Sequence, residues 1–156
     1  MKTSSITLFG LLTTLLASAC IPATREVLVQ PLMTMTVVDA DKRPVPGASV
    51  LFVSASNPHH KLHHALRLTT DEQGRVHLDA KLESETFYPL MMHGVPFYYW
   101  GWCVEKAGYQ PTVYQEHPPD ESMEVTVELQ PGVTAATCQN TGGHVFAKSA
   151  AMSDER

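Results

Sequence analysis

The stretch FYYWGWCVE, residues 97–105, decides the fold class of this chain. Aromatic and β-branched side chains of this kind favour strands, because they fit the pleated surface of a sheet. Neighbouring residues of a strand face opposite sides, so one face is expected to hold Tyr98, Trp100, Trp102 and Val104. The other face then holds Tyr99, Gly101 and Cys103. We predict a long central strand with large side chains on its inner face.

Six further segments have the length and composition of strands. They are residues 33–39, 48–54, 65–70, 75–79, 110–115 and 123–129. Proline and glycine, as in Pro46-Gly47 and Pro131-Gly132, interrupt the chain between several of these segments. No stretch has a sustained helical period. Seven short strands with frequent turn signals predict an all-β fold, a seven-stranded Ig-like β-sandwich of the Greek-key type.

The sequence DEQG, residues 71–74, separates two of these strands. Asp is favoured at the first position of a type I turn and Gly at the last. We therefore predict that residues 65–70 and 75–79 pair as a hairpin, because so short a connection leaves little choice. Residues 80–97 are expected to be irregular, since Pro89 and Pro96 disfavour a central strand.

Three motifs within this framework resemble those of carboxypeptidase regulatory-like domains. DADKRPVPGASV (39–50) resembles their opening D-x-x-G-x-P-V-x-G-A-x-V, TTDEQGRV (69–76) their T-D-x-x-G-x-F hairpin, and VEKAGY (104–109) their V-x-A-x-G-Y turn. The resemblance implies a transthyretin-like sandwich over residues 33–131. It also implies an accessory, stabilising or binding role, because none of the motif positions is catalytic in that family. Lys42-Arg43 departs from the pattern, where a turn glycine is usual.

The first 19 residues have the layout of a secretory signal peptide. A positive start at Lys2 precedes an apolar run that is too short to span a bilayer permanently. Leu16-Ala17-Ser18-Ala19-Cys20 resembles the lipobox of bacterial lipoproteins, which implies cleavage before Cys20 and a covalent lipid on its sulfur. Ile21 stands where Asp would signal inner-membrane retention, so we expect the outer membrane, facing the periplasm. Residues 20–32 are then a lipidated tether.

The chain has three cysteines, Cys20, Cys103 and Cys138. If Cys20 carries lipid, the other two remain as a pair in an oxidising compartment. We therefore predict a disulfide between Cys103 and Cys138 that pins the C-terminal tail, residues 132–156, across the sandwich. The last eight or so residues of this tail are expected to be disordered.

Histidines are concentrated in NPHHKLHHALR, residues 57–67. Imidazole is a common metal ligand, and His77 is expected to approach this segment across the predicted hairpin. One hypothesis is therefore a copper or zinc site made by His59, His60, His63, His64 and His77. The alternative is a solvated loop, because Pro58 and the following strand argue against a helix that would align the rings. Met91-Met92-His93 poses the same choice between copper ligands and an apolar plug.

Aromatic residues near the central strand form a second candidate site. Alternation along a strand forces some of these rings outward, and exposed aromatic patches are common at interfaces. One hypothesis is a surface for an envelope protein partner at Tyr88, Phe97 and Tyr99, and the alternative is simple packing of these rings.

Charge and motif content limit the possible functions. The formal net charge is −5 and no basic run occurs, which excludes nucleic acid as an expected partner. Membrane attachment is expected through the lipid alone. Neither a nucleophile elbow nor a comparable catalytic signature is present, so we predict that the chain is not an enzyme.

These features together predict a non-enzymatic lipoprotein whose β-sandwich is a binding or assembly module at the periplasmic face of the outer membrane. No cofactor is expected beyond the lipid on Cys20, unless the histidines bind metal. One alternative is a periplasmic metal-binding lipoprotein that uses the loop His59–His64. Another is a structural lipoprotein of a secretion complex.

Overall fold

The computed structural model describes residues 22–57, 61–87, 97–117 and 122–141. It divides into two compact units. The smaller unit comprises Met1–Val27 and Glu83–Val95, and the larger comprises Leu28–Leu82 and Pro96–Arg156. The smaller unit holds most of β1 (Ala23–Gln30) and β6 (Lys81–Phe87), which pair as a two-stranded sheet. Arg25 and Glu85 form an ion pair across it, with Nη2 3.3 Å from Oε2.

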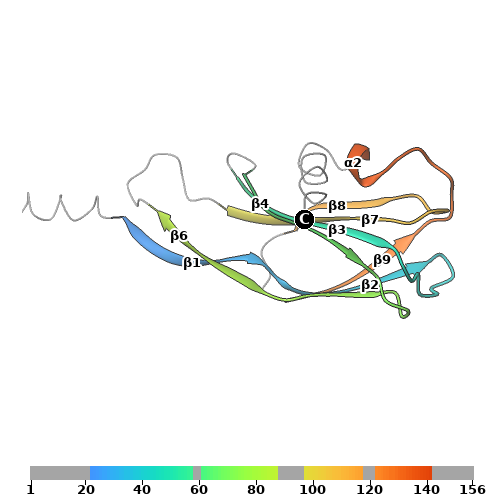
Figure 1. The fold of residues 1–156 in the computed structure, drawn as a ribbon, viewed down its shortest axis with the longest axis horizontal. Helices are drawn as coiled ribbons and strands as arrows, with labels where there is room; N and C mark the ends of the chain where they lie inside the picture. Colours follow the sequence, from blue (N-terminus) through green and yellow to red (C-terminus); the bar gives the residue numbers. More distant parts are fainter. Residues whose placement is uncertain (1–21, 58–60, 88–96, 118–121, 142–156) are drawn as a thin grey trace, which may run out of the picture. The chain divides into compact units, whose positions relative to one another are not determined.

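The larger unit is a sandwich of two sheets (Figure 1). The first sheet has the order β5-β2-β9, with bounds Arg75–Leu78, Leu32–Asp39 and Ser122–Leu129. The second has the order β4-β3-β7-β8, with bounds Lys61–Thr69, Ser49–Asn57, Phe97–Glu105 and Thr112–His117. These seven strands correspond to the seven predicted segments, and the prediction of an all-β sandwich is confirmed.

Both sheets have a register that places apolar side chains between them. In the first sheet, β2 pairs antiparallel with β5 and parallel with β9. In the second, β7 pairs antiparallel with β3 from Ser49↔Glu105 to Asn57↔Phe97. Because paired residues share a face, the large side chains of β3 and β7 meet those of β2 and β9 in one core. This core includes Met33, Met35, Phe52, Trp100, Trp102, Val127 and Leu129.

The alternation predicted for residues 97–105 is confirmed. Trp100, Trp102 and Val104 belong to the main core. Cys103 faces the other side of β7 and is also fully buried, in a smaller apolar cluster with Leu51 and Val53. Both faces of the central strand are therefore covered.

The predicted hairpin between residues 65–70 and 75–79 is wrong. The DEQG turn itself forms, because Asp71 O accepts the Gly74 N–H at 3.0 Å and Asp71 Oδ1 accepts those of Gln73 and Arg75. However, β4 lies in the four-stranded sheet and β5 in the three-stranded sheet. Thr70 directly follows β4, and its buried hydroxyl donates to Val45 O and accepts the Ala48 N–H, each at 2.8 Å. The chain then crosses between the sheets.

Two segments without a predicted strand prove to be extended. The tether predicted over residues 20–32 contains β1, and the irregular stretch predicted over residues 80–97 contains β6. In β1 only the second half is buried, at Val27, Val29 and Gln30, and the described side chains of β6 are exposed or half-buried, so neither strand alternates along its whole length. For this reason the sequence pattern did not predict either strand.

After β9 the chain continues as an irregular segment and a single turn, α2 (Cys138–Thr141). In Figure 1 the α2 turn lies beside β7 and β8, on the outer side of the four-stranded sheet. Within the described residues, no helix has the length and apolarity needed to cross a membrane.

Candidate functional site

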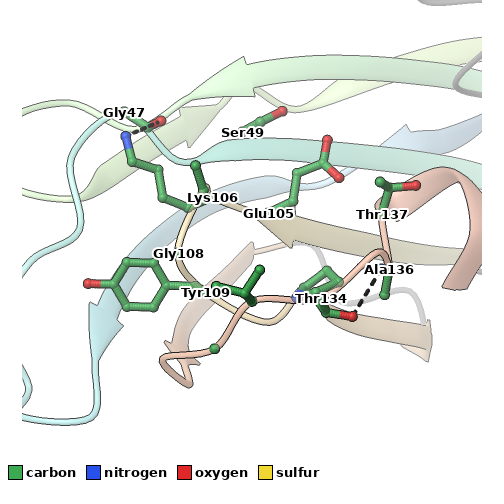
Figure 2. A pocket seen from close by; sticks show the side chains of 13 residues that line it. Gly47, Ser49, Glu105, Lys106, Gly108, Tyr109, Thr134, Ala136 and Thr137 are labelled. Atoms are coloured by element: carbon green, nitrogen blue, oxygen red, sulfur yellow. Dashed lines mark hydrogen bonds between the residues drawn. The ribbon is translucent and has the colours of Figure 1, made fainter.

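A cleft of about 640 Å³ opens at the end of the sandwich where β7 turns into β8. Its walls come from three segments that are far apart in the sequence (Figure 2). They are the start of β3 at Gly47 and Ser49, the turn from Glu105 to Pro111, and residues 132–137 after β9.

The β7–β8 turn places two side chains at the cleft. Lys106 O accepts the Tyr109 N–H at 3.1 Å, and Gly108 between them has φ +89°. This positive φ suits glycine and permits the tight reversal. The Tyr109 ring packs partly into the main core. Lys106 and Tyr109 are therefore held by the backbone of a closed turn.

Residues 131–138 form the outer wall, and we call them the C-terminal strap. One end is fixed to the turn, because the Gly132 N–H donates to Gly108 O at 2.9 Å. The other end is fixed by the disulfide between Cys138 and Cys103, whose Cα atoms lie 5.6 Å apart. The Cys138 N–H also donates to Glu105 Oε2 at 2.8 Å. Between its fixed ends the strap is exposed, and Val133 is 100% exposed.

The two charged side chains of the cleft, Glu105 and Lys106, differ in their hydrogen-bond partners. Both oxygens of Glu105 have partners, because Oε1 accepts a bond from Arg67 Nη1 at 3.2 Å and Oε2 accepts the Cys138 N–H. Lys106 Nζ donates instead to the carbonyl oxygen of Gly47 at 3.0 Å (Figure 2). Among the described residues no carboxylate pairs with Lys106. The ammonium therefore remains available to an incoming acceptor.

The rest of the lining is mixed in character. Ser49 and Thr134 contribute hydroxyl groups, while Tyr109, Pro111 and Val133 contribute apolar surface. A few polar groups beside apolar walls are typical of binding sites. The arrangement suits recognition of a ligand with an acceptor group and an apolar part.

A second cavity, of about 340 Å³, lies on the three-stranded sheet. It is lined by Leu32, Thr34, His77 and the start of β9 from Ser122 to Glu124. His77 Nδ1 lies 3.3 Å from Thr34 Oγ1, and its Nε2 lies 3.3 Å from Asp79 Oδ1. Both ring nitrogens of His77 therefore have neighbours on β2 or just after β5.

The structure does not bring His77 beside His63 and His64 across a hairpin, as the five-histidine hypothesis expected. His77 lies on β5, whereas His63 and His64 lie on β4 in the other sheet. The reason is the chain crossing at residues 70–74 that replaces the predicted hairpin. His59, His60 and the segment Met91-Met92-His93 lie outside the described residues. Within the residues that the structure describes, no group of three or more His, Cys, Asp or Glu side chains is placed to hold a metal ion.

The predicted partner surface is described only in part. Phe97 is 62% exposed at the start of β7, and Tyr99 is half-buried two residues later. Tyr88 lies outside the described residues, as does Cys20, the predicted lipidation site. The partner surface at Tyr88, Phe97 and Tyr99 and the lipidation of Cys20 both stay predictions.

The disulfide between Cys103 and Cys138 is confirmed, and with it the fixing of residues 132–138 to the sandwich. The cleft beside this bond was not predicted from the sequence. Glu105, Lys106 and Tyr109 were identified only as part of a folding turn. The signal was the proximity of VEKAGY (104–109) to Cys103, since whatever Cys103 holds must lie beside this turn.

No protein-family model matches the chain, and no curated protein matches it. Solved structures do match. The 3-chlorocatechol 1,2-dioxygenase of Rhodococcus opacus 1CP is 13% identical, with a TM-score of 0.47 over 69% of this chain and 61% of that chain. The catechol 1,2-dioxygenase of Acinetobacter sp. ADP1 is 16% identical, with a TM-score of 0.46 over 68% and 54%. This chain therefore spans less than two thirds of either dioxygenase.

A third match is the C-terminal domain of a shaft pilin from Lactobacillus rhamnosus GG. It is 12% identical, with a TM-score of 0.32 over 70% of this chain and 99% of that domain. Identities this low indicate at most a shared β-sandwich fold. They carry no statement about a ligand or an activity of this chain.

The prediction that the chain is not an enzyme is contradicted by these comparisons. Dioxygenases are among the matched structures, and the likeness is one of fold alone. A missing sequence motif does not exclude catalysis, because side chains of a site can come from distant segments, as the walls of the cleft do here.

Proposed function

We propose that the chain is a lipid-anchored module of the bacterial cell envelope, held at the periplasmic face of the outer membrane. Its β-sandwich binds or assembles with a partner through the cleft at the β7–β8 turn. In this proposal, residues 1–19 are a signal peptide and Cys20 carries the lipid. The sandwich belongs to the carboxypeptidase regulatory-like group.

The observation that carries this proposal is the disulfide at the outer wall of the cleft. Disulfides persist in oxidising compartments such as the periplasm. This bond takes two of the three cysteines and leaves Cys20, in its lipobox-like context, as the remaining one. It also holds the C-terminal strap in place before any ligand arrives. Preorganisation of this kind lowers the entropic cost of binding.

The turns of the sandwich support the family assignment. Gly47 and Gly74 have φ of +66° and +69°, and each stands at the glycine position of its motif. Gly108 of the third motif has φ +89°. The motifs of the resemblance therefore coincide with turns that require glycine.

Lipidation is tested by labelling cells with a palmitate analogue. Cys20→Ala should abolish the label on this protein, because the thioether forms at that sulfur. The double variant Cys103→Ala/Cys138→Ala is the matched control and should keep the label. Continued labelling of Cys20→Ala would contradict the anchor.

Partner binding at the cleft is tested with a photoreactive amino acid at Val133, on the exposed rim. The control carries the same amino acid at Gln73, which is also exposed but lies in a turn outside the cleft. We expect a discrete crosslinked species from Val133 alone. Ala136→Trp should remove it by filling the cleft while the melting temperature stays unchanged. A crosslink that forms equally at Gln73, or that survives Ala136→Trp, would contradict a role for the cleft.

A further inference from the structure

The pairing of β4 with β3 contains a β-bulge at the histidines. Ser54 is paired with His64, but the next residue, Ala55, is paired with Leu62. His63 is therefore the extra residue on β4, opposite no residue of β3. A bulge of this kind bends the strand and redirects side chains at that point.

The bulge changes which way the two histidines face. In a regular strand, adjacent side chains point to opposite faces, so a His-His pair would be split between them. Here the His63 ring reaches Ser56, with Nε2 2.9 Å from Oγ, and packs on Tyr98 with ring centroids 4.9 Å apart. His64 is opposite Ser54, which shares a face with Ser56. Both imidazoles therefore lie on the same face of the four-stranded sheet.

The neighbouring part of that face is unusually polar for the inner side of a sandwich. Ser54 and Trp100 are opposite each other on β3 and β7, and both are fully buried. Neither Ser54 Oγ nor Trp100 Nε1 has a hydrogen-bond partner among the described residues. Buried polar groups are normally satisfied, and a site beside them that orders a ligand or its shell would account for their retention.

One of the two histidines, His63, already has the kind of support that metal ligands need. A ligating imidazole usually gives its second nitrogen to an outer acceptor, which fixes the ring. Ser56 Oγ is in that position for His63 Nε2. Ser54 lies opposite His64, but its buried hydroxyl forms no hydrogen bond with the described residues. His64 Nε2 itself lies 3.2 Å from Lys81 Nζ.

We propose that His63 and His64 form a two-coordinate site for a monovalent d10 ion, with copper(I) or silver(I) as the ligand class. Imidazole suits copper, and a monovalent d10 ion accepts two ligands in a line, whereas zinc needs four. Two adjacent imidazoles on one face supply the two ligands of a monovalent d10 ion, but not the four ligands of zinc. At His64 Nε2, the ion replaces the hydrogen bond from the Lys81 ammonium. This site is independent of the cleft and of lipidation.

Affinity is measured on the full chain by anaerobic competition for copper(I) against a coloured chelator, with silver(I) as a redox-inert probe. His63→Ala and His64→Ala should each weaken binding by about tenfold or more, because each removes one of two ligands. Two controls, His59→Ala/His60→Ala and His77→Ala, should bind as the parent does. Lys81→Ala should bind more tightly, since it removes both a competing donor and a positive charge.

Several outcomes overturn the assignment. They are unchanged affinity in His63→Ala or His64→Ala, loss of binding in the His59/His60 variant, and affinity in Lys81→Ala at or below that of the parent. X-ray absorption supplies a readout that does not depend on any variant. Two nitrogen neighbours around copper(I) support the site, and three or four contradict it. His63→Gln and His64→Gln replace the alanine variants if the latter lose their melting transition.

Discussion

Gly74 illustrates how a single residue determines the path of the chain between the two sheets. Its φ is +69°, and a Cβ built on it would lie 2.5 Å from Val37 O. Its carbonyl oxygen accepts the Val37 N–H at 2.7 Å. The turn at residues 71–74 therefore touches β2 directly, and only a residue without a side chain fits at this contact.

Replacing Gly74 with alanine should lower the free energy of unfolding by about 2 kcal/mol or more, because backbone strain and a steric clash add together. Gly108→Ala is the matched control. It has φ +89° but no atom within 4 Å of the added Cβ, so only the strain of about 1 kcal/mol remains. Urea denaturation of both variants measures the difference. Equal losses would show that contact with β2 does not matter.

At the scale of elements, strand existence was easier to predict than strand pairing. Alternation and turn chemistry identified all seven strands of the sandwich. They did not reveal that β4 and β5 belong to different sheets, because local sequence does not record a strand's neighbours. The anchoring of Thr70 to Val45 and Ala48 decides that crossing. Long-range contacts of this kind carry no local signature.

The orientation of the histidines could not be predicted from the sequence either. Their number and spacing were visible in the sequence, but the face on which they lie was not. A one-residue bulge at His63 changes that face, and its position depends on the register between β3 and β4. The candidate pair therefore emerged only from the pairing of two strands.

The C-terminal strap is the element whose stability depends most on a covalent bond. The disulfide joins two cysteines that are 35 positions apart in the sequence. The variant Cys103→Ala/Cys138→Ala should therefore lower the free energy of unfolding by about 3–4 kcal/mol in the chain-entropy description. Proteolysis should also begin within residues 132–138, since the strap would lose its covalent attachment and keep hydrogen bonds such as those from the N–H groups of residues 132 and 138 to Gly108 O and Glu105 Oε2.

The control for this variant is Cys20→Ala, which should unfold as the parent does. Denaturation with and without reductant provides the measurement. If the double variant matched the oxidised parent in both stability and protease resistance, the bond would not be what holds the strap.

At the scale of the whole molecule, two carboxylates link stability to pH. Hydrogen bonds from the backbone N–H and the guanidinium of Arg43 lower the pKa of Asp39 below its ordinary value of 3.8. The ammonium of Lys42, which donates to Glu128, lowers the pKa of that group below 4.5. Both groups bind protons less readily in the folded state than in the unfolded state.

Because both values fall on folding, these carboxylates stabilise the fold above their unfolded pKa values, and this contribution is lost as the pH drops through the folded values. The melting temperature should therefore decrease below a pH of about 4.5. Asp39→Asn should make this decrease shallower, with its largest effect near neutral pH. Asp79→Asn, whose side chain is 91% exposed, is the control and should follow the parent. Parallel curves for Asp39→Asn and the parent would contradict this linkage.

The cleft could not be predicted from the sequence, because it depends on how the whole sandwich is assembled. Its walls come from residues 47–49, 105–111 and 132–137, which meet only once both sheets and the disulfide are in place. The charge of Lys106 became informative when the structure showed a carbonyl group, and no described carboxylate, as its partner. Composition led to the expectation that nucleic acid is not a partner, but it could not indicate this cleft.

The parallel pairing of β2 with β9 has a mechanical consequence. β2 opens the sandwich and β9 closes it, and their ladder runs from Leu32↔Ser122 to Asp39↔Leu129. A pull on the two ends of the chain would draw β2 and β9 in opposite directions along their common axis. All the hydrogen bonds of the ladder would then resist in shear at the same time, instead of opening one by one as in a peeled edge strand. A module tethered at one end and bound to a partner beyond β9 would therefore transmit tension without unfolding readily.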